Sequence, residues 1–494
     1  MRRFHPALAL ALLLLPACGG GGGGTPPAPP VLAVVPAQAS IQTGQTQAFS
    51  ATLNGAATTA VAWTVVEAGG GGIDATGLYT PPAAAGTYHV QAALSASLAV
   101  TAQASVTVTL PAAGVPGLGI GAPLNGWLPF PADNPWNQVV SALPADPDSS
   151  DVISYVGAAT TLHPDFGSGL YDGSPIGIPY AVVAGNQARV AVAYNAYGDE
   201  SDPGPFPVPS PPPYEGVAPT DSSGDRHVLV LDRDNGWLYE LYGAQLQADG
   251  TWTAGSGAVW DVTRDDQRPL GWTSADAAGL AMFPGLAKYD EVAAGAIRHA
   301  LRLTVPVTQE AWILPATHWA SSVTDPSAPP MGARFRLKAS YDISGFPPQS
   351  QVVLKALQTY GMIVADNGSA WYLGGAPDPR WDNDDLHTLG QVTGADLELV
   401  TTGSIVTSVP SGAAPAIQSF TATPAAIASG GSSTLAWSAT QATRYFVNPG
   451  PGPVRGASAA VSPAATTIYT LVAEGPYGSA TATVTVTVQP GASQ

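Results

Sequence analysis

The chain has 494 residues, with 35 Asp and Glu against 17 Lys and Arg and a formal net charge of −18 at pH 7. Proteins bind phosphate through clustered Lys and Arg, so this balance disfavours nucleic acid and anionic lipid surfaces as partners. Cys18 is the single cysteine, which excludes a disulfide within the chain and a metal site built from several thiolates.

The first eighteen residues have the layout of an export signal. Arg2 and Arg3 precede an apolar run over residues 7–15, which is too short to cross a bilayer as a helix. The LPAC that follows resembles the lipobox of bacterial lipoproteins. This resemblance implies that Cys18 is lipidated and becomes the first residue after cleavage. An ordinary signal peptide with an incidental cysteine is the alternative.

Residues 19–30 read as a tether. Six glycines form a flexible coil and TPPAPP adds a stiffer spacer, an arrangement that holds a folded body away from a membrane. Together with the lipid implied on Cys18, this indicates an exported protein anchored to the bacterial envelope. Gly19 stands where many bacterial lipoproteins carry an Asp that retains them in the inner membrane, which favours the outer membrane or the cell surface.

Residues 31–110 are expected to form an Ig-like β-sandwich. Short runs rich in Val, Thr and Ala are separated by Gly and Pro turns, and Val61, Trp63 and Val65 alternate along one strand. The segment IDATGLYTPP, residues 73–82, resembles the signature of the bacterial Ig-like repeat.

Residues 415–488 show a similar pattern of short strand-like runs between turns, and Trp437 is at the expected core position. They resemble the Ig-like or PKD-like domains that are appended to secreted bacterial proteins. Linkers at 111–125 and 407–414 are expected to separate the two sandwiches from the region between them.

The central region, residues 126–406, holds ten of the twelve Trp and five of the seven His. It resembles no family that we can name. Alternating runs between Pro and Gly turns predict strands at 188–194, 226–232, 298–305 and 333–343. One helix is predicted within 350–363, where apolar side chains recur with helical spacing. The fold class expected is therefore mainly β and multidomain, with two Ig-like sandwiches flanking a larger antiparallel β-sandwich or jelly roll that carries one packed helix.

A hairpin at 223–243 is the first candidate site. With the turn at Asn235-Gly236, His227, Leu229 and Leu231 share a strand face with Leu238, Glu240 and Tyr242, and Leu229 is expected opposite Tyr242. His227, Glu240 and Tyr242 are groups that can transfer a proton. They could equally form a half-buried hydrogen-bond cluster.

Two further stretches supply candidates. Residues 271–305 bring together Asp290, Glu291 and His299, with His299 expected on an otherwise apolar strand face. In 333–343, Arg334, Arg336 and Lys338 share one face. These cations could hold a substrate carboxylate or be neutralised by acidic residues of a neighbouring strand.

Three acidic loops, at 145–151, 197–207 and 378–385, contain closely spaced oxygens of the kind that Ca²⁺ takes as ligands. None has the EF-hand spacing, and solvated turns are the commoner outcome of such sequences, so no cofactor is assigned. The Trp and Tyr residues of 366–384 could be stacking platforms for sugars or part of the core.

No G-x-S-x-G, H-E-x-x-H, P-loop or dinucleotide-binding motif occurs, which argues against common esterases, zincin proteases and nucleotide enzymes.

The presence of a lipid anchor and two Ig-like domains in the same chain favours a central domain that acts on or binds extracellular polysaccharide. As a hydrolase it would use two carboxyl groups from Glu240, Asp290, Glu291 and Asp342. As a lyase it would use a His or Tyr with a cation, drawn from His227, Tyr242, His299, Arg334 and Arg336. A non-catalytic adhesin or glycan-binding scaffold is the alternative, and a peptidase or esterase of an uncommon type is a weaker one.

Overall fold

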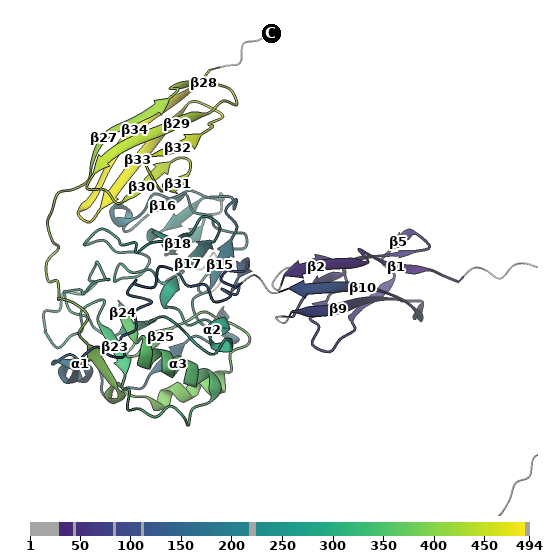
Figure 1. Ribbon diagram of the computed structural model, residues 1–494, viewed down its shortest axis with the longest axis horizontal. Helices are drawn as coiled ribbons and strands as arrows, with labels where there is room; N and C mark the ends of the chain where they lie inside the picture. The colour runs from purple at the N-terminus through teal and green to yellow at the C-terminus, as the bar shows by residue number, and fades with distance from the viewer. Residues whose placement is uncertain (1–28, 43–45, 83–84, 110–112, 217–223, 490–494) are drawn as a thin grey trace, which may run out of the picture. The chain divides into compact units, whose positions relative to one another are not determined.

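The computed structural model describes residues 29–42, 46–82, 85–109, 113–216 and 224–489. The chain divides into two compact units, residues 1–109 and 110–494 (Figure 1). Cys18, the export signal and most of the tether lie outside the described residues. None of the described helices combines the length and the apolar character needed to cross a bilayer. The mainly β, multidomain character expected from the sequence is confirmed.

The first unit contains three small sheets, ordered β1-β4-β5, β2-β10-β9-β6 and β3-β8-β7. Its buried core includes Tyr79, Val90 and Val106, and Val61, Trp63 and Val65 of β6 alternate with exposed neighbours as expected. The strands are β1 (Leu32–Val35), β2 (Gln38–Gln42), β3 (Gln47–Ala48), β4 (Ser50–Leu53), β5 (Ala56–Thr58), β6 (Val61–Val65), β7 (Gly72–Ile73), β8 (Leu78–Thr80), β9 (Gly86–Leu94) and β10 (Ser97–Thr109).

The sequence of residues 73–82 has a local physical explanation. Oδ1 of Asp74 accepts hydrogen bonds from the backbone N–H groups of Thr76 and Leu78, at 2.8 and 3.0 Å, and so closes the turn before β8. Gly77 has φ +86°, and a Cβ there would collide with the carbonyl oxygen of Phe49. Tyr79 is fully buried, and its hydroxyl donates to the carbonyl of Gly70 at 2.6 Å.

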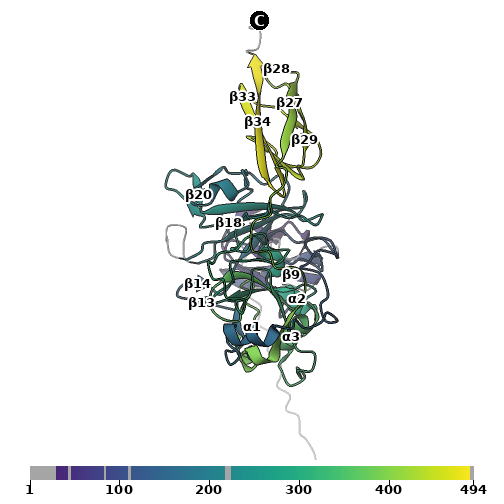
Figure 2. The ribbon, with the colours of Figure 1, turned by 90° about the vertical axis from the view of Figure 1, so that its left-hand side faces the viewer.

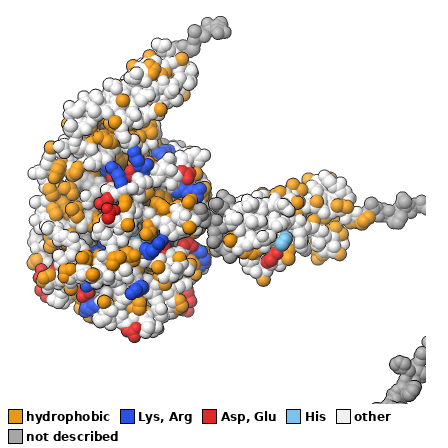
Figure 3. All heavy atoms as spheres, viewed as in Figure 1, with side chains coloured by type: hydrophobic (Ala, Val, Ile, Leu, Met, Phe, Trp, Pro, Cys, Tyr) orange, Lys and Arg blue, Asp and Glu red, His pale blue; other side chains and the backbone are white. Residues whose placement is uncertain are grey.

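The C-terminal part of the second unit is a two-sheet arrangement, ordered β27-β29-β32 and β28-β34-β33-β30-β31. Trp437 packs in its core with Leu435, Tyr469 and Leu471. The strands are β27 (Ala416–Thr423), β28 (Ala426–Ala428), β29 (Ser433–Thr440), β30 (Arg444–Asn448), β31 (Gly452–Val454), β32 (Ser458–Val461), β33 (Thr467–Gly475) and β34 (Gly478–Gln489). This C-terminal sandwich shows few charged side chains in the space-filling view (Figure 3).

The central region is built on two larger sheets. The five-stranded sheet consists of β11 (Gly119–Ile120), β15 (Tyr180–Val183), β17 (Val228–Asp232), β18 (Trp237–Tyr242) and β21 (Ser256–Asp261), in that order. The six-stranded sheet consists of β12 (His163–Asp165), β25 (Tyr372–Gly374), β22 (Leu301–Val305), β24 (Met362–Asn367), β23 (Arg334–Leu337) and β26 (Leu397–Val400).

Both sheets are mixed rather than purely antiparallel, which differs from the arrangement expected. β15 pairs with β17 and β22 pairs with β24 in parallel. Parallel neighbours need a crossover connection, and the chain between β22 and β24 includes β23 and the helix α3 (Pro348–Thr359). Strands of this kind are buried on both faces, which explains why all five residues of β17 are buried.

The predicted helix is α3, with Val353, Ala356 and Leu357 on its buried face. The described residues of the central region add three shorter helices and four 3₁₀ turns, which are too short for helical spacing to be recognised in the sequence. They are α1 (Ser149–Val156), α2 (Tyr289–Ala293), α4 (Asn383–His387), η1 (Gly198–Glu200), η2 (Phe283–Gly285), η3 (Thr388–Gln391) and η4 (Gly394–Asp396). α1 and α3 lie at the end of the second unit that is remote from the C-terminal sandwich (Figures 1 and 2).

Smaller strands complete the central region. A three-stranded sheet is ordered β16-β20-β19, and a short hairpin is formed by β13 and β14. Their bounds are β13 (Leu170–Tyr171), β14 (Ser174–Pro175), β16 (Val192–Tyr194), β19 (Gln245–Leu246) and β20 (Trp252–Ala254).

The hairpin of β17 and β18 has the expected faces but a different register. Leu229 pairs with Glu240 rather than with Tyr242. The register shifts by two residues because Asp232 closes the turn: its carboxylate accepts from the backbone N–H of Asn235 at 3.1 Å, and Gly236 N donates to its carbonyl. Most of the hairpin is core, since its two faces belong to two separate hydrophobic clusters.

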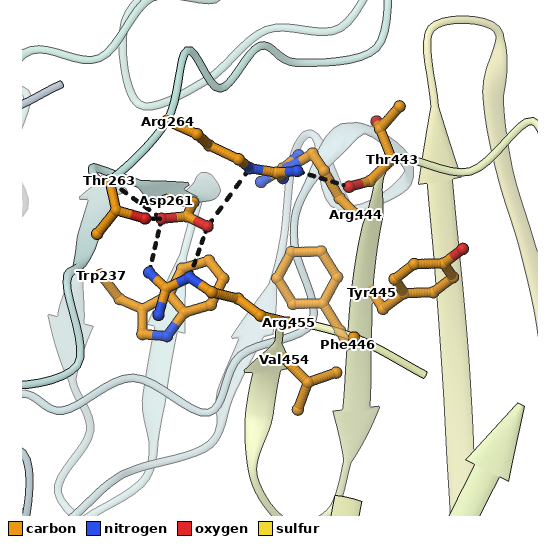
Figure 4. Close-up of a pocket in the computed structure, with 11 residues that line it drawn as sticks. Trp237, Asp261, Thr263, Arg264, Thr443, Arg444, Tyr445, Phe446, Val454 and Arg455 are labelled. Atoms are coloured by element: carbon orange, nitrogen blue, oxygen red, sulfur yellow. Dashed lines mark hydrogen bonds and ion pairs between the residues drawn. The ribbon is translucent and has the colours of Figure 1, made fainter. Parts of the chain in front are cut away.

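The C-terminal sandwich packs directly on the central region. Nη2 of Arg444 lies 3.0 Å from Oδ2 of Asp202, an oxygen that also accepts from Nη1 of Arg268 at 2.8 Å. Phe446 belongs to a hydrophobic cluster made otherwise of central-region residues. In the close-up, the Arg455 guanidinium covers the ring of Trp237, 4.2 Å from its centroid, and donates twice to Asp261 (Figure 4). The two parts therefore share both a core and buried ion pairs.

Candidate functional site

Arg302 on β22 lies at the centre of a buried group of charged side chains. Its Nε and Nη2 atoms donate to the two oxygens of Asp276 at 2.8 and 2.7 Å, and Nη2 also contacts Oδ2 of Asp366 at 3.2 Å. Asp276 is 1% exposed, and its charge is matched by this two-point contact. Burial raises the pKa of Asp366 to about 6, with the charge of Asp276 adding to the effect and Arg302 opposing it.

His227 is held between two acceptors. Its Nδ1 lies 2.5 Å from Oε2 of Glu215, and its Nε2 lies 3.0 Å from the carbonyl oxygen of Ala275. Two acceptors favour an imidazolium that donates from both nitrogens. Burial disfavours this charge, but Glu215 outweighs burial and raises the pKa of His227 to about 9.

The same contact keeps Glu215 ionised. Burial acts to raise the pKa of this carboxyl, but the charge and hydrogen bond of His227 lower it below its usual value. The Glu215 side chain is 25% exposed, so an ionised carboxylate is accessible from solvent.

Glu215 lines a hollow of about 720 Å³, which we call the large hollow. Asp165, at the end of β12, lines it too. Partial burial raises the pKa of Asp165, and the negative charge of Glu215 contributes in the same direction. The large hollow thus holds two carboxyl groups whose pKa values are moved in opposite directions by their surroundings.

Aromatic rings form part of the large hollow. The β12–β25 pairing places His163 opposite Tyr372, and their rings stack with centroids 4.1 Å apart. Tyr171 on β13 is 75% exposed and lines the same hollow. Among the described lining residues there is no Lys or Arg.

A second hollow of about 280 Å³, the small hollow, adjoins the first through the Glu215–His227 contact. His227, Tyr242 and His318 line it. Nδ1 of His318 lies 2.7 Å from the carbonyl oxygen of Ala277, which assigns a proton to Nδ1. Other lining residues include Asp225, Asp276, Asp366 and Asn367.

The chain is not assigned to a family by comparison with known proteins. No family model matches it, and no curated protein matches it. Solved structures that align with it include the N-terminal eight Ig domains of Down syndrome cell adhesion molecule isoform 1.30.30, with TM-score 0.14 and 7% identity over 94% of this chain. The chain spans 48% of that structure's length. The human desmocollin-1 ectodomain aligns with TM-score 0.14 and 10% identity, over 94% of this chain and 80% of that one. Likeness at this level carries no argument about function.

Of the residues selected from the sequence, His227 and Tyr242 meet at the small hollow, with ring centroids 5.7 Å apart. Glu240 does not join them. It is fully buried and accepts hydrogen bonds from the backbone of Met282 and Phe283 and from Nε1 of Trp260. Burial raises the pKa of Glu240 to about 7.

The remaining candidates line neither hollow. Asp290 pairs with Arg380 at 3.0 Å, and both oxygens of Glu291 lie 3.1 Å from Nε2 of His299. Arg336 pairs with Glu398 on the neighbouring strand β26 at 2.7 Å, which is the neutralised arrangement that the sequence left open. The other residues considered, Asp342 and Arg334, also lie outside the two hollows, and Arg334 donates to the carbonyls of Pro135, Gln138 and Tyr360.

Sequence reasoning missed Asp165, Glu215 and Asp366 as site residues. Glu215 follows a Pro-rich segment with no periodicity, and Asp165 belongs to a three-residue strand. Asp366 is the second-last residue of β24, at the start of a stretch that was considered for its Trp and Tyr residues instead. Only the fold brings these side chains near Arg302.

In the part of the chain that the structure describes, no three His, Cys, Asp or Glu side chains are grouped as metal ligands. The acidic loops use their oxygens elsewhere. Asp202 pairs with Arg268 and Arg444, and the carboxylate of Asp385 accepts from the first backbone N–H groups of α3.

Proposed function

We propose that the central region binds a glycan in the large hollow and hydrolyses it, with Asp165 as general acid and Glu215 as nucleophile or general base. The observation that carries the proposal is the pair of carboxyl groups in one hollow with pKa values moved apart, raised for Asp165 and lowered for Glu215. Glycoside hydrolysis uses two carboxyl groups, one that keeps its proton more readily and one that is ionised, and these opposite pKa shifts match those two roles.

The roles follow from the environments. Asp165 retains its proton to a higher pH than an ordinary Asp and can give it to the leaving oxygen of a glycosidic bond. Glu215, held ionised by His227, can attack the anomeric carbon or take a proton from an attacking water. Because Oε2 contacts His227, Oε1 is the oxygen available for this step.

The lining supports a neutral sugar over an anionic one. Sugar rings stack on aromatic faces, which His163, Tyr372 and Tyr171 offer. A lyase that acts on a uronate needs a cation beside the substrate carboxylate, and the described lining residues of the large hollow include no Lys or Arg. Hydrolysis of a neutral glycan is therefore favoured over elimination.

The test is incubation of the full chain with a panel of α- and β-glucans, mannan, galactan and xylan, measuring released reducing ends and binding in parallel. Turnover of at least one glycan is expected. Binding without turnover would replace the proposal with the alternative of a glycan-binding scaffold or adhesin. Absence of both binding and turnover would refute a glycan function for the large hollow.

We further propose that the protein is exported and anchored by a lipid on Cys18, so that it meets extracellular glycan at the outer membrane or cell surface. The LPAC sequence and the tether after it support this. Expression in a bacterium fed an alkyne-labelled fatty acid should label the wild-type chain and place it in the membrane fraction. Cys18→Ala should lose both the label and the membrane association, and a labelled Cys18→Ala chain would contradict the anchor.

A further inference from the structure

The wall of the small hollow is rich in hydrogen-bond acceptors, although the carboxylate of Asp366 already accepts from Nη2 of Arg302 and from the backbone N–H of Asn367. The carboxylates of Asp225 and Asp366 line it, as does Asn367, whose Oδ1 is buried and has no hydrogen-bond partner among the described residues. His318 also lines the small hollow, and its Nδ1 donates to the carbonyl oxygen of Ala277.

The Ser and Thr hydroxyls in its wall already donate within the protein. The hydroxyls of Ser256, Thr273 and Ser274 donate to backbone carbonyls, and the described lining includes no Lys or Arg. This lining therefore favours a ligand that brings its own N–H or O–H groups. An ammonium group has three donors and no acceptor, which complements this wall.

The charges around the small hollow also favour a cationic ligand. His227 and Glu215 balance each other, but Arg302 faces two carboxylates, those of Asp276 and Asp366. Asp225 adds an exposed negative charge at the rim. The small hollow is thus left with an excess of negative charge that a cation would neutralise.

Two tyrosines in its lining and the volume of the small hollow indicate what kind of cation fits it. Tyr242 is half-buried in the wall and Tyr197 is 46% exposed at the rim, and aromatic rings attract cations. A volume of about 280 Å³ is small for a drug-sized ligand. The adjoining large hollow has the aromatic lining expected for a glycan.

We propose that the small hollow binds the protonated amine of an amino sugar. The ammonium lies between Asp225 and Asp366, and the sugar ring rests against Tyr242. This site does not depend on hydrolysis in the large hollow, so each proposal can fail without the other.

The test is calorimetric titration of the full chain with D-glucosamine, N-acetyl-D-glucosamine, D-glucose and propylamine. Glucosamine should bind, whereas glucose and N-acetylglucosamine, which lack the cation, should bind at least about tenfold more weakly, the cost of one hydrogen bond to a charged group. Propylamine shares the ammonium without the ring and should also bind more weakly. No binding of glucosamine, or equal binding of all three sugars, would overturn the proposal, and propylamine binding as tightly as glucosamine would overturn the assignment to an amino sugar.

Variants locate the site. Asp225→Asn and Asp366→Asn should each weaken glucosamine binding about tenfold or more. Asp172→Asn is the matched control, because Asp172 is an exposed carboxyl that lines the large hollow instead. Loss of binding in Asp172→Asn with unchanged binding in Asp225→Asn would overturn the assignment to the small hollow. Asp225 is exposed, so its replacement does not endanger the fold.

Discussion

Nδ1 of His227 lies 2.5 Å from Oε2 of Glu215, and this contact joins the walls of the two hollows. Each side chain fixes the charge of the other: Glu215 raises the pKa of His227 to about 9, and His227 lowers the pKa of Glu215. The hairpin that carries His227 is otherwise core, so its functional surface is confined to the end where His227 and Tyr242 lie.

The His227–Glu215 pair predicts a pH-dependent contribution to stability. The pKa of His227 rises from an ordinary 6.5 to about 9 on folding, so its stabilisation is complete below pH 6.5 and is lost as the pH rises to 9. The difference in free energy of unfolding between wild type and His227→Gln should therefore shrink by up to about 3 kcal/mol over this range. Urea denaturation at pH 6, 7.5 and 9 measures it. A constant difference would contradict the charged state assigned to His227.

The same pair predicts a shift in the pH profile of glycan hydrolysis. Activity should fall at low pH as Glu215 takes up a proton and at higher pH as Asp165 loses one. In His227→Gln the cation is gone and burial raises the pKa of Glu215, so the acid limb of kcat/KM should move to higher pH. His318→Gln, in the small hollow, is the control and should leave the limb in place. An unmoved limb in His227→Gln would exclude His227 as the group that keeps Glu215 ionised.

Arg444 predicts that the C-terminal sandwich stabilises the central region. Its guanidinium is buried between Asp202 and Glu474, and it also donates to the carbonyl of Val259. Arg444→Met removes the guanidinium that contacts buried Glu474 and one of the two that contact Asp202, and it should lower the free energy of unfolding by about 3–5 kcal/mol. The exposed Arg298→Met should change it by less than about 0.5 kcal/mol. Equal Tm values for the two variants, measured by calorimetry, would show that the junction adds no stability.

Replacing Gly361, which follows α3, should destabilise the fold through a steric collision. Gly295 is the matched control, because it has a positive φ without the collision. Gly361 and Gly295 both have positive φ, +70° and +84°, but only at Gly361 would a Cβ collide with the carbonyl of Phe335, while Gly295 faces open space. Gly295→Ala should cost about 1–2 kcal/mol from backbone strain alone. Gly361→Ala should cost clearly more in the same denaturation experiment, and equal costs would mean that the collision is relieved without penalty.

Sequence patterns correctly predicted those helices and strands that are determined by residues close together in the chain. The spacing of Val353, Ala356 and Leu357 identified α3, and alternation along the β17–β18 hairpin assigned its faces correctly. The hairpin register was wrong because the Asp232 side chain, not the Asn-Gly pair alone, closes the turn.

Contacts between residues far apart in the sequence leave no such pattern in the sequence. The Arg444–Asp202 contact joins positions 242 residues apart, and the charged group around Arg302 combines β22, the end of β24 and two loops. Parallel pairing of β22 and β24 likewise depends on a crossover that strand patterns do not specify. The residues missed by sequence reasoning are therefore those that only tertiary structure brings together.

The most direct test of the central claim compares kcat/KM for Asp165→Asn, Glu215→Gln and Asp172→Asn on a glycan that the wild type hydrolyses. All three replace a carboxyl that lines the large hollow. Asp165→Asn and Glu215→Gln should each lose about 10²–10⁴-fold, the usual contribution of a positioned acid or base, with substrate binding retained. Asp172→Asn should stay close to wild type. Losses of similar size in all three variants, or in none, would contradict the assignment of Asp165 and Glu215 as the reacting pair.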